Sequence, residues 1–342
     1  MRTVLCDLLG IRFPIIQDGM GPFSTAALAA AVSEAGGLGT VSIPGMLHEP
    51  DEARRLMRAE IEATASGTER GFAVNVPVGV GPAGDPLPPT AAYLQAVLEA
   101  KRDRDLGDRL VACITSAGLP SPEVVSAFHE EGLLHLHKVG AVRHARKAVA
   151  AGADAVIASG FEMGGHTHAH PVHTMVLAPQ VVAAVDVPVV VAGGLFDGRG
   201  LAAALAMGAA GIAMGTRFIA TEENDWHPAY KRAIVESGEW GDVLFPGFFG
   251  PVRGLDNPGA RRLIDLIRSG ELGEEELGVW KEERLVAAQR DGEVEDGILV
   301  AGQCAAAIDG IVSVHDLLPD MVREAAGLLE VAARLAAEPN DH

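Results

Sequence analysis

The chain has 342 residues, of which 48% are hydrophobic, so it can bury a large core and build a barrel with a smaller second unit. Its formal net charge of -19 excludes nucleic acid and anionic membrane surfaces as expected partners, because both repel an acidic protein. No signal peptide or membrane-spanning apolar run is visible, so we expect a cytoplasmic protein. The widely spaced Cys6, Cys113 and Cys304 predict free buried thiols in a reducing compartment.

Short apolar runs alternate with alanine-rich helical stretches up to about residue 220. The expected strands are 15–17, 38–43, 71–76, 110–115, 134–139, 154–158, 187–192 and 210–214. The expected helices between the first six strands are 25–35, 50–65, 90–101, 122–131 and 142–151. This alternation predicts an α/β fold of the (β/α)8 TIM-barrel type. A doubly wound sheet is disfavoured, because no GxGxxG sequence follows the first strand.

The sequence changes character past residue 221. Two tryptophans, Trp226 and Trp240, fall outside the strand–helix rhythm, and a charged helical stretch follows at 274–289. We interpret 221–296 as a smaller inserted lid or substrate domain over the barrel mouth. Residues 1–220 and 297–342 then form the barrel, with a final helix at about 317–337.

Residues just beyond the strand ends are candidates for the active site, because TIM barrels bind their substrates at that end. The residues in this position are Gly19, Met20, Gly21, Ser42, Asn75, Thr115, Lys138, His166, Gly193, Gly194, Gly215 and Thr216. The polar members of this set are suited to hydrogen-bond a flat heteroaromatic ring. Two glycine-bearing loops, Gly193-Gly194 and Gly215-Thr216, follow the last two strands, where this fold usually binds phosphate. The alternative is that these glycines only form tight turns.

The strand 134–139 places Leu134, Leu136 and Lys138 on one face, since strand side chains alternate. If the leucines point into the barrel, Lys138 reaches its mouth, where a cation would stabilise negative charge on a reduced ring. The alternative is a solvated lysine at the strand end. His135 and His137 would then face the helices.

Four histidines, His166, His168, His170 and His173, follow the sixth strand at a spacing that allows metal binding. No nearby cysteine or carboxylate completes a familiar ligand set, and Pro171 interrupts the extended geometry. We therefore expect no metal site. His166, directly behind Gly164-Gly165, is interpreted as the catalytic or substrate-orienting residue.

Seven ordered motifs resemble the nitronate monooxygenases, formerly called 2-nitropropane dioxygenases. They begin with PIIQDGMG at 14–21, AGGLG at 35–39 and FAVN at 72–75. They continue with KVG at 138–140, EMGGH at 162–166, AGGLFDGRG at 192–200 and MGTRF at 214–218. AGQ at 301–303 matches as well, so the resemblance spans nearly the whole chain.

The resemblance implies an FMN-dependent barrel enzyme with a lid. It assigns FMN contacts to Met20, Gly21, Asn75, Lys138, Gly165, Gly193, Gly194, Gly215, Thr216 and Gln303, and catalysis to His166. The implied reaction converts an alkyl nitronate and O2 to a carbonyl compound and nitrite. The expected partners are thus a small-molecule substrate and O2, with a homodimer as the assembly to test.

The same Gly-Gly-His motif also resembles flavin-dependent enoyl-acyl carrier protein reductases, which take hydride from NAD(P)H. A reductase of enoyl thioesters or quinones is therefore the alternative function. A flavin-binding or metal-binding module without turnover is a third hypothesis. The insertion with Trp226 and Trp240, and the histidines that follow His166, depart from both families and leave the substrate open.

Overall fold

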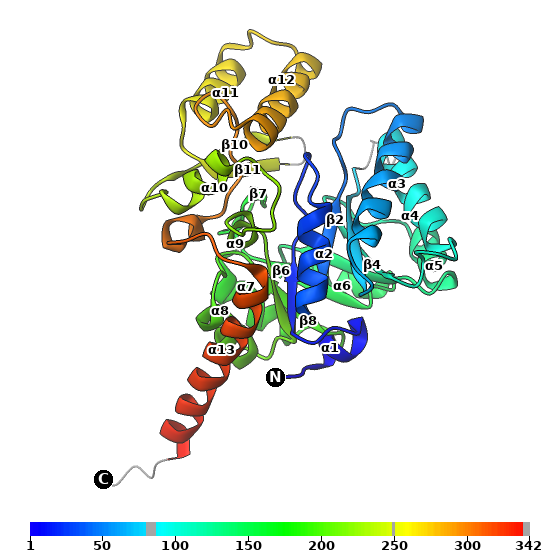
Figure 1. Ribbon diagram of the computed structural model, residues 1–342, viewed down its shortest axis with the longest axis vertical. Coiled ribbons are helices and arrows are strands. Elements are labelled where there is room, and N and C mark those ends of the chain that lie inside the picture. Colours follow the sequence, from blue (N-terminus) through cyan, green and yellow to red (C-terminus); the bar gives the residue numbers. More distant parts are fainter. Residues whose placement is uncertain (80–86, 248–249, 338–342) are drawn as a thin grey trace.

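The computed structural model describes residues 1–79, 87–247 and 250–337, and it has the predicted (β/α)8 TIM barrel (Figure 1). The last five residues of the expected barrel segment, 338–342, lie outside the described part. The parallel strands are β1 (Ile15–Gln17), β2 (Gly39–Ser42), β3 (Phe72–Pro77), β4 (Leu110–Ser116), β5 (Leu134–Val139), β6 (Ala155–Ser159), β8 (Val189–Ala192) and β9 (Gly211–Met214). They are ordered β1-β9-β8-β6-β5-β4-β3-β2, and a parallel bridge between Ile16 and Leu38 joins the two ends of the sheet. Each strand lies within two residues of its predicted range.

Helices cover the outside of the barrel. They are α2 (Ala26–Ala35), α3 (Pro50–Ser66), α4 (Pro88–Lys101), α5 (Pro122–Glu130), α6 (Val142–Ala150), α7 (Thr174–Val182), α8 (Gly198–Ala206) and α13 (Val314–Ala337). The short α9 (Thr216–Ile219) instead lies at the carboxyl end of β9. The helices α3, α4 and α5 begin with proline, whose missing N–H and fixed φ suit the first helical position. Helix α13 packs on α8 and α2, and its C-terminal half projects away from the body (Figure 1).

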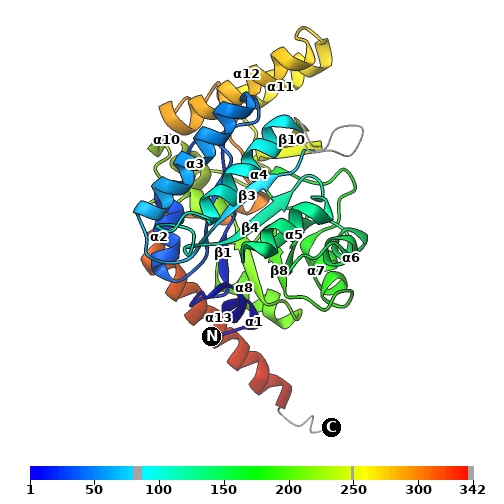
Figure 2. The ribbon, with the colours of Figure 1, turned by 90° about the vertical axis from the view of Figure 1, so that its right-hand side faces the viewer.

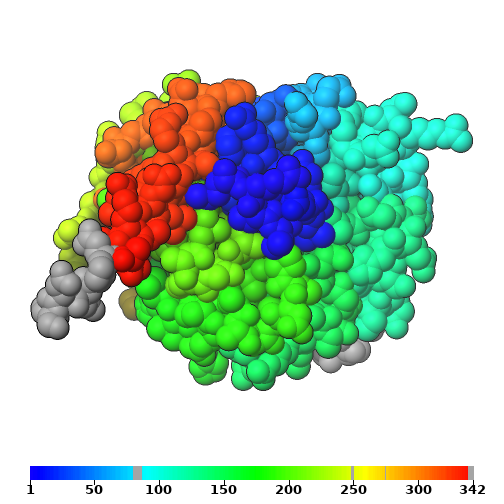
Figure 3. Space-filling view, turned by 90° about the horizontal axis from the view of Figure 1, so that it is seen from below, coloured from blue at the N-terminus to red at the C-terminus, as the bar shows by residue number. Residues whose placement is uncertain are grey.

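The barrel interior is filled by small and branched side chains, as close packing of eight strands requires. Ala73, Ala112, Ile114, Leu136 and Ile157 belong to this buried cluster. The short helix α1 (Val4–Leu9) packs against the same cluster and covers the amino-terminal end of the barrel, where the blue segment lies in Figure 3. The barrel is therefore closed at one end, and a ligand can enter only from the other.

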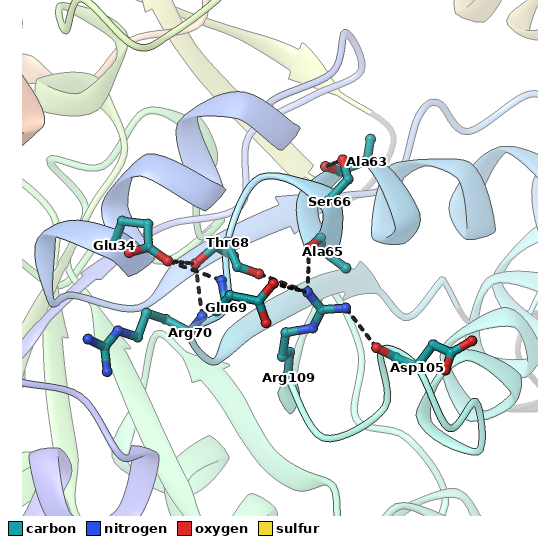
Figure 4. Close-up of polar contacts among 9 residues, drawn as sticks. All are labelled: Glu34, Ala63, Ala65, Ser66, Thr68, Glu69, Arg70, Asp105 and Arg109. Carbon is teal, nitrogen blue, oxygen red and sulfur yellow. Dashed lines mark hydrogen bonds and ion pairs between the residues drawn. The ribbon is translucent and has the colours of Figure 1, made fainter.

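A polar network fastens the connection between α3 and β3 at the amino ends of the strands, away from the carboxyl ends that carry the candidate residues (Figure 4). The Arg109 guanidinium donates to the carbonyls of Ala65 (2.6 Å), Thr68 (3.0 Å) and Asp105 (2.7 Å). The Thr68 hydroxyl in turn donates to Glu34 (2.6 Å), whose pKa these contacts lower. The network satisfies loop carbonyls that a turn would otherwise leave unpaired.

The residues between 221 and 296 form a separate layer above the barrel mouth (Figures 1 and 2). They build α10 (Pro228–Val235), β10 (Asp242–Gly247), β11 (Gly250–Leu255), α11 (Pro258–Ser269) and α12 (Glu274–Val286), followed by a π-helical turn (Ala287–Asp291). A further short strand, β7 (Gly165–His166), pairs with β11 to complete a three-stranded sheet. The sequence did not predict this strand.

The lid has its own buried cluster, which includes Phe245, Leu263 and Ile298. Ile298 lies just past the predicted boundary at 296, so the packing of the lid continues into the returning chain. The three cysteines are free and buried, as predicted. Among the described residues, no helix is both long and apolar enough to cross a membrane.

Candidate active site

A cavity of about 320 Å³ lies at the carboxyl ends of the strands, and residues of the lid form part of its wall. It is lined by His166 and by nine of the ten residues predicted to bind the cofactor: Met20, Gly21, Asn75, Lys138, Gly165, Gly193, Gly194, Gly215 and Thr216. The exception is Gln303, whose side chain is exposed although Gly302 and Cys304 line the cavity. The Gln303 backbone instead donates its N–H to the Glu162 carbonyl (3.0 Å).

The loop after β8 is shaped to receive an anion. Gly193 and Gly194 have φ of 100° and 77°, a conformation that glycine adopts without strain. Within the described ranges, neither of their N–H groups donates a hydrogen bond to the protein. A Cβ on Gly193 would lie 2.8 Å from the Gly160 carbonyl oxygen, so no larger residue fits. These N–H groups are free for a phosphate, whereas the start of α8 is already capped by Asp197, which accepts the Gly200 N–H (3.0 Å).

The opposite wall of the cavity presents an amide. The Asn75 amide donates to the Ser42 hydroxyl (3.2 Å), and its buried Oδ1 has no partner in the part of the chain that the structure describes. A Cβ on Gly19 would lie 2.4 Å from the Asn75 Cβ, so this glycine makes room for the amide. A buried acceptor without a donor fits the ring N–H of a flavin. Together with the glycine loop, it makes the residues of this cavity suitable for FMN.

The predicted orientation of β5 is confirmed. Leu136 points into the barrel interior and Lys138 lines the cavity, where its ammonium lies 2.6 Å from the Asp18 carboxylate. Asp18 was missed, although it directly follows β1 and could have been found among the strand-end residues. The prediction for Thr115 is wrong. Its hydroxyl faces outward and bonds to both His135 and His137 (2.7 Å each), because it lies one residue past the inward-facing Ile114.

His166 is held in place by the strand that the sequence did not predict. In β7 it lies opposite Val252 of β11, and the next residue, Thr167, donates its N–H to the Pro251 carbonyl (2.8 Å). Burial, together with the positive charge of Lys281, lowers the pKa of His166 to about 3. The imidazole is therefore neutral at physiological pH.

Helix α12 brings a buried cation to the same cavity. Lys281 is only 5% exposed, lines the cavity and lies with its ammonium 5.7 Å from the centre of the Phe245 ring. Burial lowers its pKa to about 8, so it remains mostly charged near pH 7. No sequence pattern indicated this residue, because the charged stretch 274–289 is more than a hundred residues from His166 and its charges are typical of a solvated helix.

A sequence profile of the nitronate monooxygenase family matches residues 2–324. The chain belongs to this family. It is therefore an oxidoreductase of the flavin-dependent type, as the sequence predicted. No part of the family assignment identifies the substrate.

Proteins similar to this chain are named for different activities. The chain is 33% identical to (3aS,4S,5R,7aS)-5-hydroxy-7a-methyl-1-oxo-octahydro-1H-indene-4-carboxyl-CoA dehydrogenase of Mycobacterium tuberculosis, over 98% of this chain and 99% of that protein. It is 32% identical to a probable nitronate monooxygenase of Staphylococcus saprophyticus, over 75% of this chain and 79% of the other. The structure of FabK from Thermotoga maritima superposes with a TM-score of 0.83, at 33% identity, over 98% of this chain and 99% of that one.

The three histidines that follow His166 in the sequence have different surroundings. The His168 ring packs against Gly140, where a Cβ would lie 2.0 Å from it, and burial lowers its pKa. His170 is exposed, and the His173 ring lies 3.4 Å from the Glu162 carboxylate. Among the described residues, no three potential ligands gather into a metal site.

The layer above the barrel mouth is fastened directly to two loops of the barrel. Gln289, in the π-helical turn, donates to the Gly21 carbonyl (2.9 Å) and accepts the Phe23 N–H (3.0 Å). Glu282 accepts the Met46 N–H (2.9 Å) in the loop after β2. The lid therefore holds the loops after β1 and β2 by their backbones, which no sequence pattern indicated.

Proposed function

We propose that this protein is an FMN-dependent oxidoreductase that converts alkyl nitronates and O2 to a carbonyl compound and nitrite. The backbone N–H groups of Gly193 and Gly194 and the Thr216 hydroxyl would hold the phosphate. Asn75 and Lys138 would bind the ring. When bound, FMN would supply the electron acceptor for the organic substrate and the donor for O2.

The pairing of a neutral histidine with a charged lysine on one cavity wall carries this proposal. A nitronate is an anion whose charge is spread over two nitro oxygens. The Lys281 ammonium would attract that charge from a buried position, where a charge pair is stronger than in solution. The neutral His166 ring would donate one hydrogen bond to a nitro oxygen without adding a second positive charge.

The low basicity of His166 also distinguishes two forms of the substrate. A side chain with a pKa of about 3 is a weak base near pH 7 and removes a carbon-bound proton inefficiently. The enzyme should therefore prefer a preformed nitronate to the neutral nitroalkane. His166 then orients the anion instead of generating it.

Anaerobic mixing of the purified yellow protein with a nitronate tests the proposal. We expect the flavin absorbance to bleach, and nitrite to form in air. His166→Ala should lose most of this activity while keeping the colour, and His170→Ala is the matched control because it changes an exposed histidine of the same segment. A colourless protein, or a yellow protein that yields neither bleaching nor nitrite, would contradict the proposal.

A second candidate is an oxidoreductase of CoA thioesters, with or without NAD(P)H. It is favoured by the full-length similarity to the CoA dehydrogenase of Mycobacterium tuberculosis. An enolate formed next to a thioester is also an oxyanion, so Lys281 and His166 would suit it for the same physical reason. Bleaching of the flavin by NADPH or by an acyl-CoA under argon, without bleaching by a nitronate, would favour this candidate.

A further inference from the structure

Helix α6 carries a cluster of positive charge that the proposed chemistry does not use. We call Arg143, His144, Arg146 and Lys147 the α6 patch. The chain has 46 acidic and only 27 basic residues, yet α6 has no acidic residue. None of Arg143, Arg146 and Lys147 forms an ion pair with any acid of the described chain. In so acidic a protein, three neighbouring unpaired cations indicate an anionic ligand.

The α6 patch lies close to one residue of the cavity wall, although no residue of α6 itself lines the cavity among the described residues. Its residues at positions i, i+3 and i+4, Arg143, Arg146 and Lys147, share one exposed face of the helix. Helix α6 follows β5 after a short turn, and Lys138 of β5 lines the cavity. His168, also on the cavity wall, lies with its ring centre 6.5 Å from that of His144. His144 therefore places the start of α6 next to the cavity wall.

An apolar surface lies on the neighbouring helix. Met175 and Val176, in the first turn of α7, are 68% and 53% exposed. Helices α6 and α7 pack side by side on the same side of the barrel (Figure 2). A ligand on this surface would thus meet cations on α6 and apolar side chains on α7. This combination suits phosphates attached to a flat base.

We propose that the α6 patch binds the phosphates of an adenosine-diphosphate tail, carried by a CoA thioester or by NAD(P)H, whose reactive end enters the cavity. Both molecules carry an adenosine diphosphate joined to a reactive group, a pantetheine thioester in CoA thioesters and a nicotinamide riboside in NAD(P)H, so the phosphates are separate from the reacting atoms. Binding energy from such a remote group can position the reacting end. A small nitronate has no group that could reach the patch, so this inference rests on the second candidate function.

The test compares the FMN-loaded protein with two triple variants of equal charge. The first, Arg143→Gln/Arg146→Gln/Lys147→Gln, removes the cations of the patch. The control, Arg104→Gln/Arg268→Gln/Arg334→Gln, removes three exposed cations elsewhere that also lack ion pairs with described acids. Calorimetry measures the Kd of free CoA and of NADPH in separate titrations, at low and high salt.

We expect the patch variant to bind CoA or NADPH roughly tenfold more weakly and with a smaller salt dependence, since each exposed charge pair contributes a modest amount. The control should stay within about twofold of the wild type. Weakening of CoA alone assigns the patch to a thioester, and weakening of NADPH alone assigns it to the nicotinamide cofactor.

The proposal would be overturned if both variants bound the nucleotides equally weakly, or if neither CoA nor NADPH bound at about 1 mM. Binding of an acidic carrier protein to the patch, without binding of CoA or NADPH, would also overturn it. Nitronate turnover is measured in parallel. If the protein turns over a nitronate but binds neither nucleotide, only the proposed role of the α6 patch is rejected. If nucleotide binding depends on the patch but no nitronate is turned over, only the nitronate function is rejected.

Discussion

Replacing Lys281 by methionine should make the protein more stable and less active. The pKa of Lys281 falls from an ordinary 10.5 to about 8, so its charged form is less stable in the fold than in the unfolded chain. At about 1.4 kcal/mol for each pH unit, this difference amounts to roughly 3 kcal/mol near pH 7. Methionine has a similar shape and removes this cost, but it also loses the contact with the Phe245 ring, worth about 0.5–1 kcal/mol. The expected net gain is about 2 kcal/mol.

The pH dependence follows from the direction of the shift. Between about pH 8 and about pH 10.5 the unfolded chain binds more protons at this group than the folded chain, so stability rises with pH across that window. The gain of Lys281→Met should therefore be full near pH 7, shrink through the window and vanish above it. Urea unfolding of wild type and variant across this range measures the gain, with Lys147→Met, an exposed lysine, as the control.

Activity should change in the opposite sense. Without the ammonium, the kcat/KM for a nitronate should fall at least about tenfold, because the anion would lose its charge partner in a buried site. A variant that is less stable near pH 7, or whose gain persists above pH 10.5, would refute the account of a buried charge. A variant that is more stable yet fully active would agree with the account of a buried charge but would show that Lys281 does not bind the substrate.

Three further predictions test other parts of the site. Between about pH 5 and pH 7, the kcat/KM for a nitronate should show no change caused by ionisation of His166, because the pKa of about 3 lies below that range. A change in kcat/KM near pH 6.5 that is absent in His166→Ala would instead show a histidine of ordinary basicity. Gly194→Asp should weaken FMN retention on ultrafiltration at least about tenfold, because it places a carboxylate near the phosphate. The control Gly10→Asp changes a glycine of similarly positive φ far from the cavity and should retain the flavin. Equal losses in the two variants would point to backbone strain instead. Gln289→Leu should cost about 2–4 kcal/mol by leaving two backbone groups of the first loop unpaired, measured by urea unfolding; an unchanged midpoint would mean that the lid does not support this loop.

The barrel could be predicted because its signals are local. Each strand is a short, largely apolar run, and this pattern depends only on the residues of the strand and its immediate neighbours in the sequence. The alternation within β5 was sufficient to place Lys138 in the cavity and His135 on the outer face. Thr115 was misplaced because the candidates were chosen by their position after the strand without the same test of alternation.

The part of the site that comes from the lid was not predictable in this way. Strand β7 has only two residues and exists because β11, more than eighty residues later, supplies its hydrogen bonds. Lys281 and Gln289 lie in a stretch whose charge pattern predicts a solvated helix, and only the packing of the lid buries them. Such long-range pairing leaves no periodic signal in the sequence.

The lid sets the charges of the active site through a single physical cause. Burial lowers the pKa values of both His166 and Lys281, but their ordinary values of 6.5 and 10.5 lie on opposite sides of pH 7. The histidine falls to about 3 and stays neutral, while the lysine falls only to about 8 and stays mostly charged. Removing water from the cavity thus gives one neutral hydrogen-bonding group beside one cation, whereas two cations or two neutral groups would not suit an anion as well. In a chain with a net charge of -19, the buried Lys281 thus places a positive charge in this cavity, which would favour the anionic substrate proposed above.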